Sequence, residues 1–162
     1  MGRRPVVAVI GGQRAPAAAL RNAEAVGRLL AEAGAVVVCG GLGGVMEAAC
    51  RGAKSAGGLT VGILPGGDAR EANPFVDLAI TTGMGTARNV IVVRTADAVI
   101  AIDGAYGTLS EMAHALEQGR RIVSLGAWDL GKMGVDSERV VVAKTPEDAV
   151  RFALSGLPRP QA

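Results

Sequence analysis

One stretch of the chain decides its fold: residues 98–111, AVIAIDGAYGTLSE. The five apolar residues 98–102 are typical of a buried strand, and Gly104 and Gly107 indicate a tight turn directly after it. Thr108 and Glu111 then stand at the expected start of a helix. A strand, a glycine turn and a helix in this order leave free backbone N–H groups at the carboxyl edge of a sheet, where α/β proteins bind anionic ligands.

The same alternation of strands and helices runs from one end of the chain to the other. Apolar runs predict strands over residues 5–10, 35–39, 59–64, 76–80, 98–102, 121–125 and 140–142. Amphipathic or capped segments predict helices over residues 15–33, 45–56, 86–95, 108–118 and from 145 onward. We therefore predict a single-domain, doubly wound α/β fold with a mostly parallel, Rossmann-like sheet. It should cover residues 1–156 and be followed by a C-terminal tail, 157–162.

The composition disfavours several classes of partner. The 162 residues carry a net charge of only +2, and aromatic residues make up 2%. Because there is neither a basic run nor a set of aromatic residues for stacking on bases, no nucleic acid partner is expected. No apolar run approaches the roughly 18 residues of a membrane helix, so no membrane partner is expected either. Cys39 and Cys50 lack CxxC spacing and the chain has one histidine, so we predict buried free thiols, no metal site and a cytoplasmic protein.

The segment 40–44, GGLGG, precedes the second expected helix and holds four glycines in five residues. A tight turn needs one or two glycines, so this density favours close approach by a ligand. Close packing of the loop against neighbouring backbone is the alternative.

Arg88 lies in the first turn of the helix expected over 86–95, where a cation opposes the positive end of the helix dipole. An anion or a carboxylate in the cleft would explain it, whereas a solvated arginine is the alternative. Thr108 and Glu111 have the T-x-x-E spacing of a capping box, in which the glutamate is structural. In the functional alternative, Thr108 holds a phosphate and Glu111 projects into the cleft as a polarising carboxylate.

Together these segments resemble the LOG-like superfamily, whose members were formerly described as lysine decarboxylase-like proteins. Its signatures are a GGGxxGLMG-type loop, an Arg-Lys pair and PGGxGTxxE. Here they correspond to residues 39–47, to Arg88-Asn89 and to residues 103–111. The segment 82–90, TGMGTARNV, is more similar to the molybdenum-cofactor carrier-like branch of this superfamily.

The resemblance implies two different functions. LOG proteins are phosphoribohydrolases that release the base from a nucleoside 5′-monophosphate, and Arg88 and Glu111 would then be catalytic. Lysine decarboxylation is not implied. The carrier-like branch implies binding of a pterin or nucleotide phosphate without established catalysis.

The sequence departs from the LOG pattern at four positions. Asn89 stands in place of Lys, Asp103 in place of Pro, and Glu47 and Ala105 each in place of Gly. Two of these changes add a carboxylate and one removes a cation. The pocket should therefore be less positive than that of a phosphoribohydrolase.

We therefore expect a protein that binds a phosphorylated nucleotide- or pterin-like molecule at the carboxyl edge of the sheet, with a molybdenum-cofactor carrier as the sharpest form. A LOG-type N-glycosidic hydrolase is the alternative, so the sequence leaves open whether the protein is an enzyme. The expected ligand-binding residues are Gly12, Gly41, Gly43, Gly44, Arg88, Asn89, Gly104, Gly107 and Thr108. No cofactor is required, and the candidate bound molecules are the molybdenum cofactor and a nucleotide monophosphate. The resemblance implies a homodimer or homotetramer.

Overall fold

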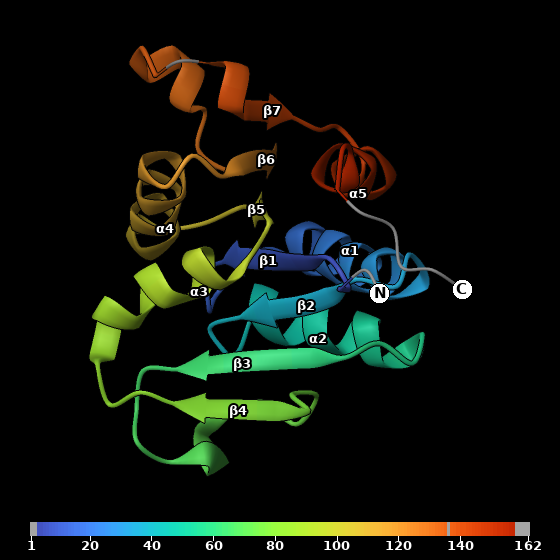
Figure 1. Ribbon diagram of the computed structural model, residues 1–162, viewed down its shortest axis with the longest axis vertical. Coiled ribbons are helices and arrows are strands. Elements are labelled where there is room, and N and C mark those ends of the chain that lie inside the picture. Colours follow the sequence, from blue (N-terminus) through green and yellow to red (C-terminus); the bar gives the residue numbers. More distant parts are fainter. Residues whose placement is uncertain (1–2, 136, 158–162) are drawn as a thin grey trace.

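The computed structural model describes residues 3–135 and 137–157, which form one seven-stranded sheet flanked by helices (Figure 1). The strands are β1 (Val6–Gly11), β2 (Val36–Cys39), β3 (Thr60–Leu64), β4 (Leu78–Thr81), β5 (Ala98–Ile102), β6 (Arg121–Leu125) and β7 (Val140–Val142). The α-helices are α1 (Ala17–Glu32), α2 (Val45–Ser55), α3 (Asn89–Thr95), α4 (Tyr106–Glu117) and α5 (Pro146–Leu154). Short 3-10 turns are η1 (Ala69–Glu71), η2 (Gly85–Arg88), η3 (Leu130–Met133) and η4 (Ser137–Arg139).

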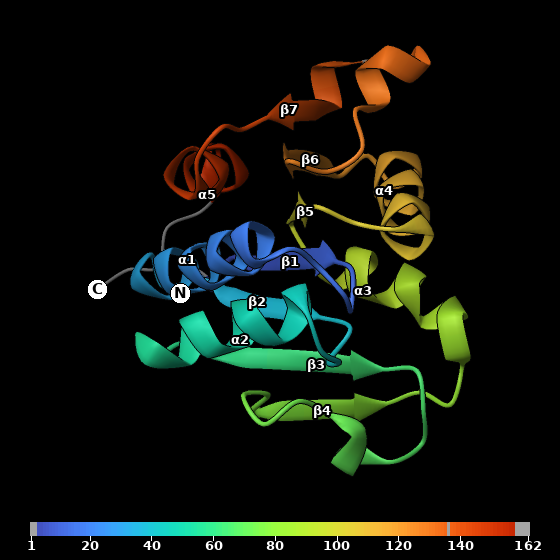
Figure 2. The same cartoon turned by 180° about the vertical axis from the view of Figure 1, so that it is seen from behind.

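The sheet has the strand order β4-β3-β2-β1-β5-β6-β7, and every neighbouring pair is parallel. The chain starts near the centre with β1, builds outward to β4 at one edge, and then returns to place β5 on the other side of β1 (Figure 2). This reversal creates a switch point between the carboxyl ends of β1 and β5, where doubly wound sheets bind ligands. The predicted doubly wound fold is confirmed, and the sheet is parallel throughout.

Helices α1, α2 and α5 cover one face of the sheet, and α3 and α4 cover the other (Figures 1 and 2). The side chains of β1 alternate between these two layers. Val7 and Val9 pack with the first group of helices, whereas Ala8 and Ile10 pack with the second. Because both faces are buried, each position in the central strands has to be apolar.

Helices α1 and α2 pack with their backbones in contact. A Cβ atom added to Gly27 of α1 would lie 1.9 Å from the carbonyl oxygen of Ala49, and one added to Gly52 of α2 would lie 1.9 Å from that of Glu24. Glycine is therefore required on both sides of this crossing.

Most boundaries lie within two residues of those expected; β4, for example, begins at Leu78 and not at residue 76. The segment expected as one helix over 86–95 begins with the 3-10 turn η2, and α3 starts only at Asn89. The helix expected from Thr108 begins two residues earlier, at Tyr106. At the C-terminus, Leu157 packs against the core, and the rest of the predicted tail, residues 158–162, lies outside the described residues.

None of the helices in the described residues combines the length and the apolar character needed to cross a membrane.

Candidate functional site

The switch point between β1 and β5 opens into a pocket of about 260 Å³. Its walls come from the turns after β1, β2, β3 and β5, from η2 and from the N-terminal halves of α2, α3 and α4. The lining residues are Gly11, Gly12, Gln13, Leu42, Met46, Pro65, Thr86, Arg88, Asn89, Ala105, Gly107, Thr108 and Glu111. Two of them, Arg88 and Glu111, are charged side chains that are only 8% and 7% exposed. Buried charged side chains at a pocket wall are typical of functional sites.

Arg88 is held by carbonyl oxygens and not by a carboxylate. Its Nε donates to the carbonyl oxygen of Ile63 at 2.8 Å, its Nη2 to that of Gly40 at 3.4 Å, and its Nη1 to Oδ1 of Asn89. These bonds use three of the five N–H donors of a guanidinium group. No ion pair involves Arg88 within the described part of the chain. Burial lowers the pKa of Arg88, and the nearby Glu111 acts in the opposite direction.

Glu111 lies one helical turn after Thr108 on the buried face of α4. Within residues 3–135 and 137–157, its carboxylate accepts no hydrogen bond and forms no ion pair. Burial raises the pKa of Glu111 to about 7, against the opposing effect of the Arg88 charge. The carboxyl group is therefore about half protonated at neutral pH and available to a ligand.

The start of α4 presents free donors beside these two side chains. The first intrahelical bond is donated by the N–H of Leu109 to the carbonyl oxygen of Ala105 at 3.2 Å, so the N–H groups of residues 106–108 have no partner within the helix. Thr108 is the third residue of this helix and not its cap, and Glu111 does not reach back to the helix start. The capping-box interpretation of these two residues is therefore wrong.

The turn that leads into α4 has an unusual backbone. Asp103 has a φ of 51° and Gly104 a φ of 131°. Proline, whose ring fixes φ near −65°, cannot take the conformation seen at position 103, whereas aspartate tolerates it. At this position the sequence has aspartate where the PGGxGTxxE pattern has proline, and the turn seen here is one that proline could not form.

Close packing explains two of the glycines in the loop after β2. A Cβ atom on Gly41 would lie 2.6 Å from Cδ2 of Leu64, and one on Gly44 would lie 2.3 Å from the carbonyl oxygen of Gly12. Both glycines also have positive φ angles, 77° and 66°. Gly43, in contrast, has open space around it.

Leu42 is the member of this loop that lines the pocket, and Gly40 contacts two other lining residues, Arg88 and Met46. A Cβ atom on Gly40 would lie 2.6 Å from Nη2 of Arg88 and 2.8 Å from Sδ of Met46. The guanidinium group therefore occupies the place that any side chain at position 40 would take.

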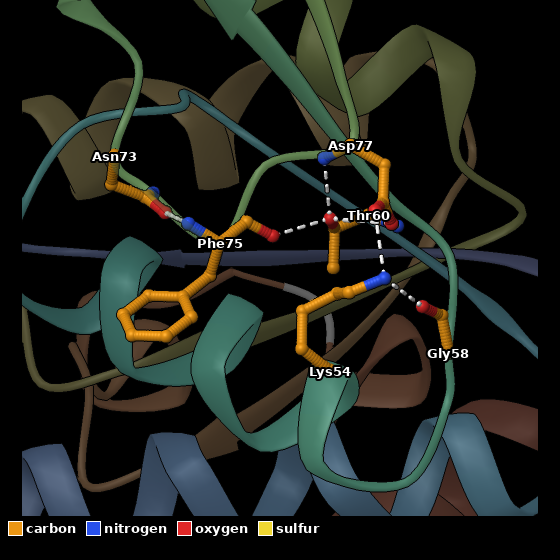
Figure 3. Close-up of polar contacts among 6 residues, drawn as sticks. All are labelled: Lys54, Gly58, Thr60, Asn73, Phe75 and Asp77. Atoms are coloured by element: carbon orange, nitrogen blue, oxygen red, sulfur yellow. Dashed lines mark hydrogen bonds and ion pairs between the residues drawn. The ribbon is translucent and has the colours of Figure 1, made fainter.

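Asn73, whose side chain Figure 3 shows beside Phe75, ties the glycine-rich loop to the connection between β3 and β4. Its backbone N–H donates to the carbonyl oxygen of Gly41 at 2.8 Å, and its Nδ2 donates to that of Leu42 at 2.9 Å. Its Oδ1 accepts from the N–H of Phe75 at 3.0 Å. The loop 40–44 beside the pocket is thus held in place by Asn73 as well as by its own close packing.

Asp77 anchors the same connection to α2 and β3 (Figure 3). Its carboxylate accepts from Nζ of Lys54 at 2.7 Å and from the backbone N–H of Thr60 at 3.0 Å. Burial alone would raise the pKa of Asp77, but these bonds outweigh it and lower the pKa. The ionised carboxylate therefore stabilises this edge of the sheet.

A family model described as the SLOG cluster4 family matches residues 4–150. The chain belongs to this family. A protein of Archaeoglobus fulgidus is 48% identical over 152 residues, which are 92% of this chain and 94% of that protein.

Two solved structures are similar to this SLOG cluster4 protein over nearly the whole chain. The molybdenum cofactor binding protein of the phototrophic bacterium Rippkaea orientalis has 40% sequence identity and a TM-score of 0.86, covering 93% of this chain and 95% of that one. The molybdenum cofactor carrier protein of Chlamydomonas reinhardtii has 33% identity and a TM-score of 0.85, covering 93% and 96%. The resemblance to the carrier-like branch of the LOG-like superfamily is thereby confirmed.

The pocket of this SLOG cluster4 protein brings together part of the predicted site. The predicted residues that line it are Gly12, Arg88, Asn89, Gly107, Thr108 and Glu111. The predicted residues that do not line it are Gly41, Gly43, Gly44 and Gly104. A Cβ atom on Gly104 would lie 2.6 Å from Cβ of Thr108, so Gly104 acts by letting the turn close against α4.

Sequence reasoning missed several lining residues of this family member. Gln13 directly follows Gly12, and Pro65 directly follows β3, so their position after a strand was an available signal. Met46 and Thr86 carry no such signal, because their place in the wall depends on how the elements pack. Cys39 and Cys50 are buried free thiols, as predicted. No group of three His, Cys, Asp or Glu residues in the described ranges could hold a metal ion.

Proposed function

We propose that this protein binds a phosphorylated pterin- or nucleotide-like small molecule in the pocket between β1 and β5. The observation that carries the proposal is Arg88, a buried cation at the pocket wall without a carboxylate partner in the described residues. The free N–H groups at the start of α4 would receive the phosphate together with it. Glu111 adds an independent reason, because a buried carboxylate without a hydrogen bond calls for a donor on the ligand.

The molybdenum cofactor is the sharpest candidate for this ligand. The two solved relatives, at 40% and 33% identity, are described as a molybdenum cofactor binding protein and a molybdenum cofactor carrier protein. The hydrogen-bond donors and acceptors in the pocket are of the kinds that this ligand would need. The guanidinium of Arg88 and the start of α4 would hold the phosphate, while Glu111 and the Nδ2 of Asn89 would meet polar groups of the ligand next to the phosphate. Binding of this kind needs no chemical step.

Calorimetric titration with ribose 5-phosphate, AMP and a pterin phosphate tests the proposal. Arg88→Ala should weaken binding of all three at least about thirtyfold, because a buried charge that pairs with a ligand contributes 2 kcal/mol or more. Arg94→Ala is the matched control, since Arg94 is an exposed arginine on α3, the helix that Arg88 directly precedes. Its affinities should equal those of the wild type.

The cofactor itself is tested on protein purified from cells that make it. After oxidation, the bound fraction should show pterin fluorescence, and mass spectrometry should detect molybdenum. Protein that binds neither pterin, molybdenum nor any phosphorylated probe would contradict the proposed function.

A phosphoribohydrolase is the second candidate, and Glu111 favours it. A buried carboxyl group with a pKa of about 7 suits general acid–base catalysis at neutral pH. Water would replace the base at C1′ of the ribose as the glycosidic C–N bond breaks. Glu111 would transfer the proton that the water loses to the departing base. Arg88 would hold the ribose phosphate in place.

Incubation with a panel of nucleoside 5′-monophosphates separates this candidate from simple binding. A hydrolase would release free base, and Glu111→Gln would abolish the release while ribose 5-phosphate still binds. If no base appears across the panel, the hydrolase candidate is eliminated and the binding function remains.

A further inference from the structure

Two aromatic side chains lie beside the part of the pocket wall that Ala105 and Gly107 form, although neither is itself a lining residue. The chain has one tryptophan and one tyrosine, and both lie here. Tyr106 opens α4, and Trp128 follows β6. Their rings stack with centroids 6.4 Å apart and planes inclined by 27°, and Tyr106 is 83% exposed. Binding of a phosphate inside the pocket does not require this pair.

The pair is fixed to the pocket wall. The Nε1 of Trp128 donates to the carbonyl oxygen of Ala105 at 3.2 Å. Ala105 and Gly107, the residues on either side of Tyr106, both line the pocket. Trp128 is also packed against the core on the α4 side of the sheet. Trp128 therefore acts as a support, and Tyr106 is the ring surface that stays open.

The size of the pocket indicates what this surface could receive. Its volume of about 260 Å³ is below the roughly 300–1,000 Å³ of pockets that bury a whole drug-sized ligand. A nucleotide-sized molecule with its phosphate at α4 would therefore extend past the rim. Exposed aromatic rings bind flat heterocycles by stacking, which is worth about five- to 150-fold in affinity per base.

We propose that Tyr106, supported by Trp128, is a stacking platform for the flat bicyclic nitrogen heterocycle, a pterin or a purine, of a ligand whose phosphate lies inside the pocket. This inference rests on the proposed function and adds to it the chemistry of the part outside. A sugar phosphate without a flat heterocycle would bind in the pocket but would gain no affinity from stacking on the platform.

Three probes and two variants test the platform. Wild type, Tyr106→Ala and Tyr106→Phe are titrated with AMP, a pterin phosphate and ribose 5-phosphate. Tyr106→Ala should weaken the ring-bearing probes about tenfold or more, Tyr106→Phe should keep them within about twofold, and ribose 5-phosphate should bind all three proteins equally. The probe that loses more in Tyr106→Ala identifies the preferred heterocycle. Because Trp128 is the single tryptophan, its fluorescence should respond to the ring-bearing probes and not to ribose 5-phosphate.

Unchanged affinity of Tyr106→Ala for both ring-bearing probes would overturn the platform. So would an equal loss for ribose 5-phosphate, which would mean that Tyr106 acts through the helix start. A lower mass of Tyr106→Ala in sedimentation would assign the ring to a contact between copies and would also overturn it. If the wild type binds none of the three probes, the proposed function itself fails, whereas equal affinities of the wild type and Tyr106→Ala for all three probes defeat the platform alone.

Discussion

At the scale of single residues, the pocket depends on two buried charges that do not bond to each other. Arg88 attracts an anion, whereas an ionised Glu111 would repel it. Because the pKa of Glu111 is raised to about 7, roughly half of the molecules carry it neutral at physiological pH. The glutamate therefore reduces the affinity for a phosphate less than a surface carboxylate at the same place would.

Replacement of Glu111 by glutamine should change how stability depends on pH. The pKa of Glu111 is raised from 4.5 to about 7, so its contribution to stability is present below pH 4.5 and is lost as the pH rises through 7. Each pKa unit corresponds to about 1.4 kcal/mol, so the wild type should lose on the order of 3 kcal/mol relative to Glu111→Gln between pH 4.5 and 8.5. Urea unfolding across this range measures the difference.

Glu117→Gln is the control for this experiment, because Glu117 is an exposed carboxylate on the same helix. It should follow the wild-type profile. If the unfolding free energies of Glu111→Gln and the wild type change with pH in parallel, Glu111 is not held in the buried state described above.

Gly40→Ala should disable the pocket without unfolding the protein. The new Cβ would lie 2.6 Å from Nη2 of Arg88 and 2.8 Å from Sδ of Met46, which are the ends of two flexible side chains. The guanidinium group must move, and the unfolding free energy should fall by about 1–3 kcal/mol, the usual cost of overpacking. We expect at least tenfold weaker binding of ribose 5-phosphate by calorimetry. Gly43→Ala, in the same loop but with open space, should bind as the wild type does, and equal affinities of the two variants would refute the role of Gly40.

At the scale of elements, the contact between α1 and α2 limits what the sequence tolerates. Gly27→Ala gains about 1 kcal/mol of helix propensity but places a Cβ 1.9 Å from the backbone oxygen of Ala49. Overpacking costs about 1–3 kcal/mol, and a 1.9 Å approach to a backbone atom belongs at the upper end, about 2–3 kcal/mol, so the net effect should be destabilising by about 1–2 kcal/mol in urea unfolding. Gly107→Ala, also in a helix but with no atom within 4 Å of its Cβ, should be neutral or stabilising. A Gly27→Ala variant as stable as the wild type would contradict this packing.

The central strands could be predicted from the sequence because they are buried on both faces and therefore apolar at successive positions, as in β5. The start of α4 could not, because its T-x-x-E spacing imitates a capping box while the turn at Asp103 lets the helix begin at Tyr106. For the site, the segment 103–111 follows from its position after a strand, and Arg88 follows from its position at the start of an expected helix. The roles of Gly40 and Tyr106 depend on distances between elements, which no local pattern encodes.

At the scale of the whole molecule, the crossover from one half of the sheet to the other gathers the site. The turn after β1, the loop 40–44 and the segment 103–111 are far apart in the chain, and they meet because β1 lies between β2 and β5. The pocket is therefore a product of the topology, and the residues on each turn decide what it binds.

The exposed edge of the sheet favours association between copies. Leu78 and Ile80 on the edge strand β4 are 55% and 42% exposed, and apolar side chains on an unpaired edge are typical of contact surfaces. We expect sedimentation to give the mass of two or four chains of 16.3 kDa. Leu78→Lys should lower that mass, and a wild-type protein that sediments as one chain would contradict the expected homodimer or homotetramer.

The most direct test of the central claim is a crystal structure of the protein grown with a saturating concentration of AMP or a pterin phosphate. We predict phosphate density in contact with the backbone N–H groups of Gly107 and Thr108 and with the guanidinium group of Arg88. Phosphate density only at another place on the molecule, or a pocket without ligand density under saturating conditions, would contradict it.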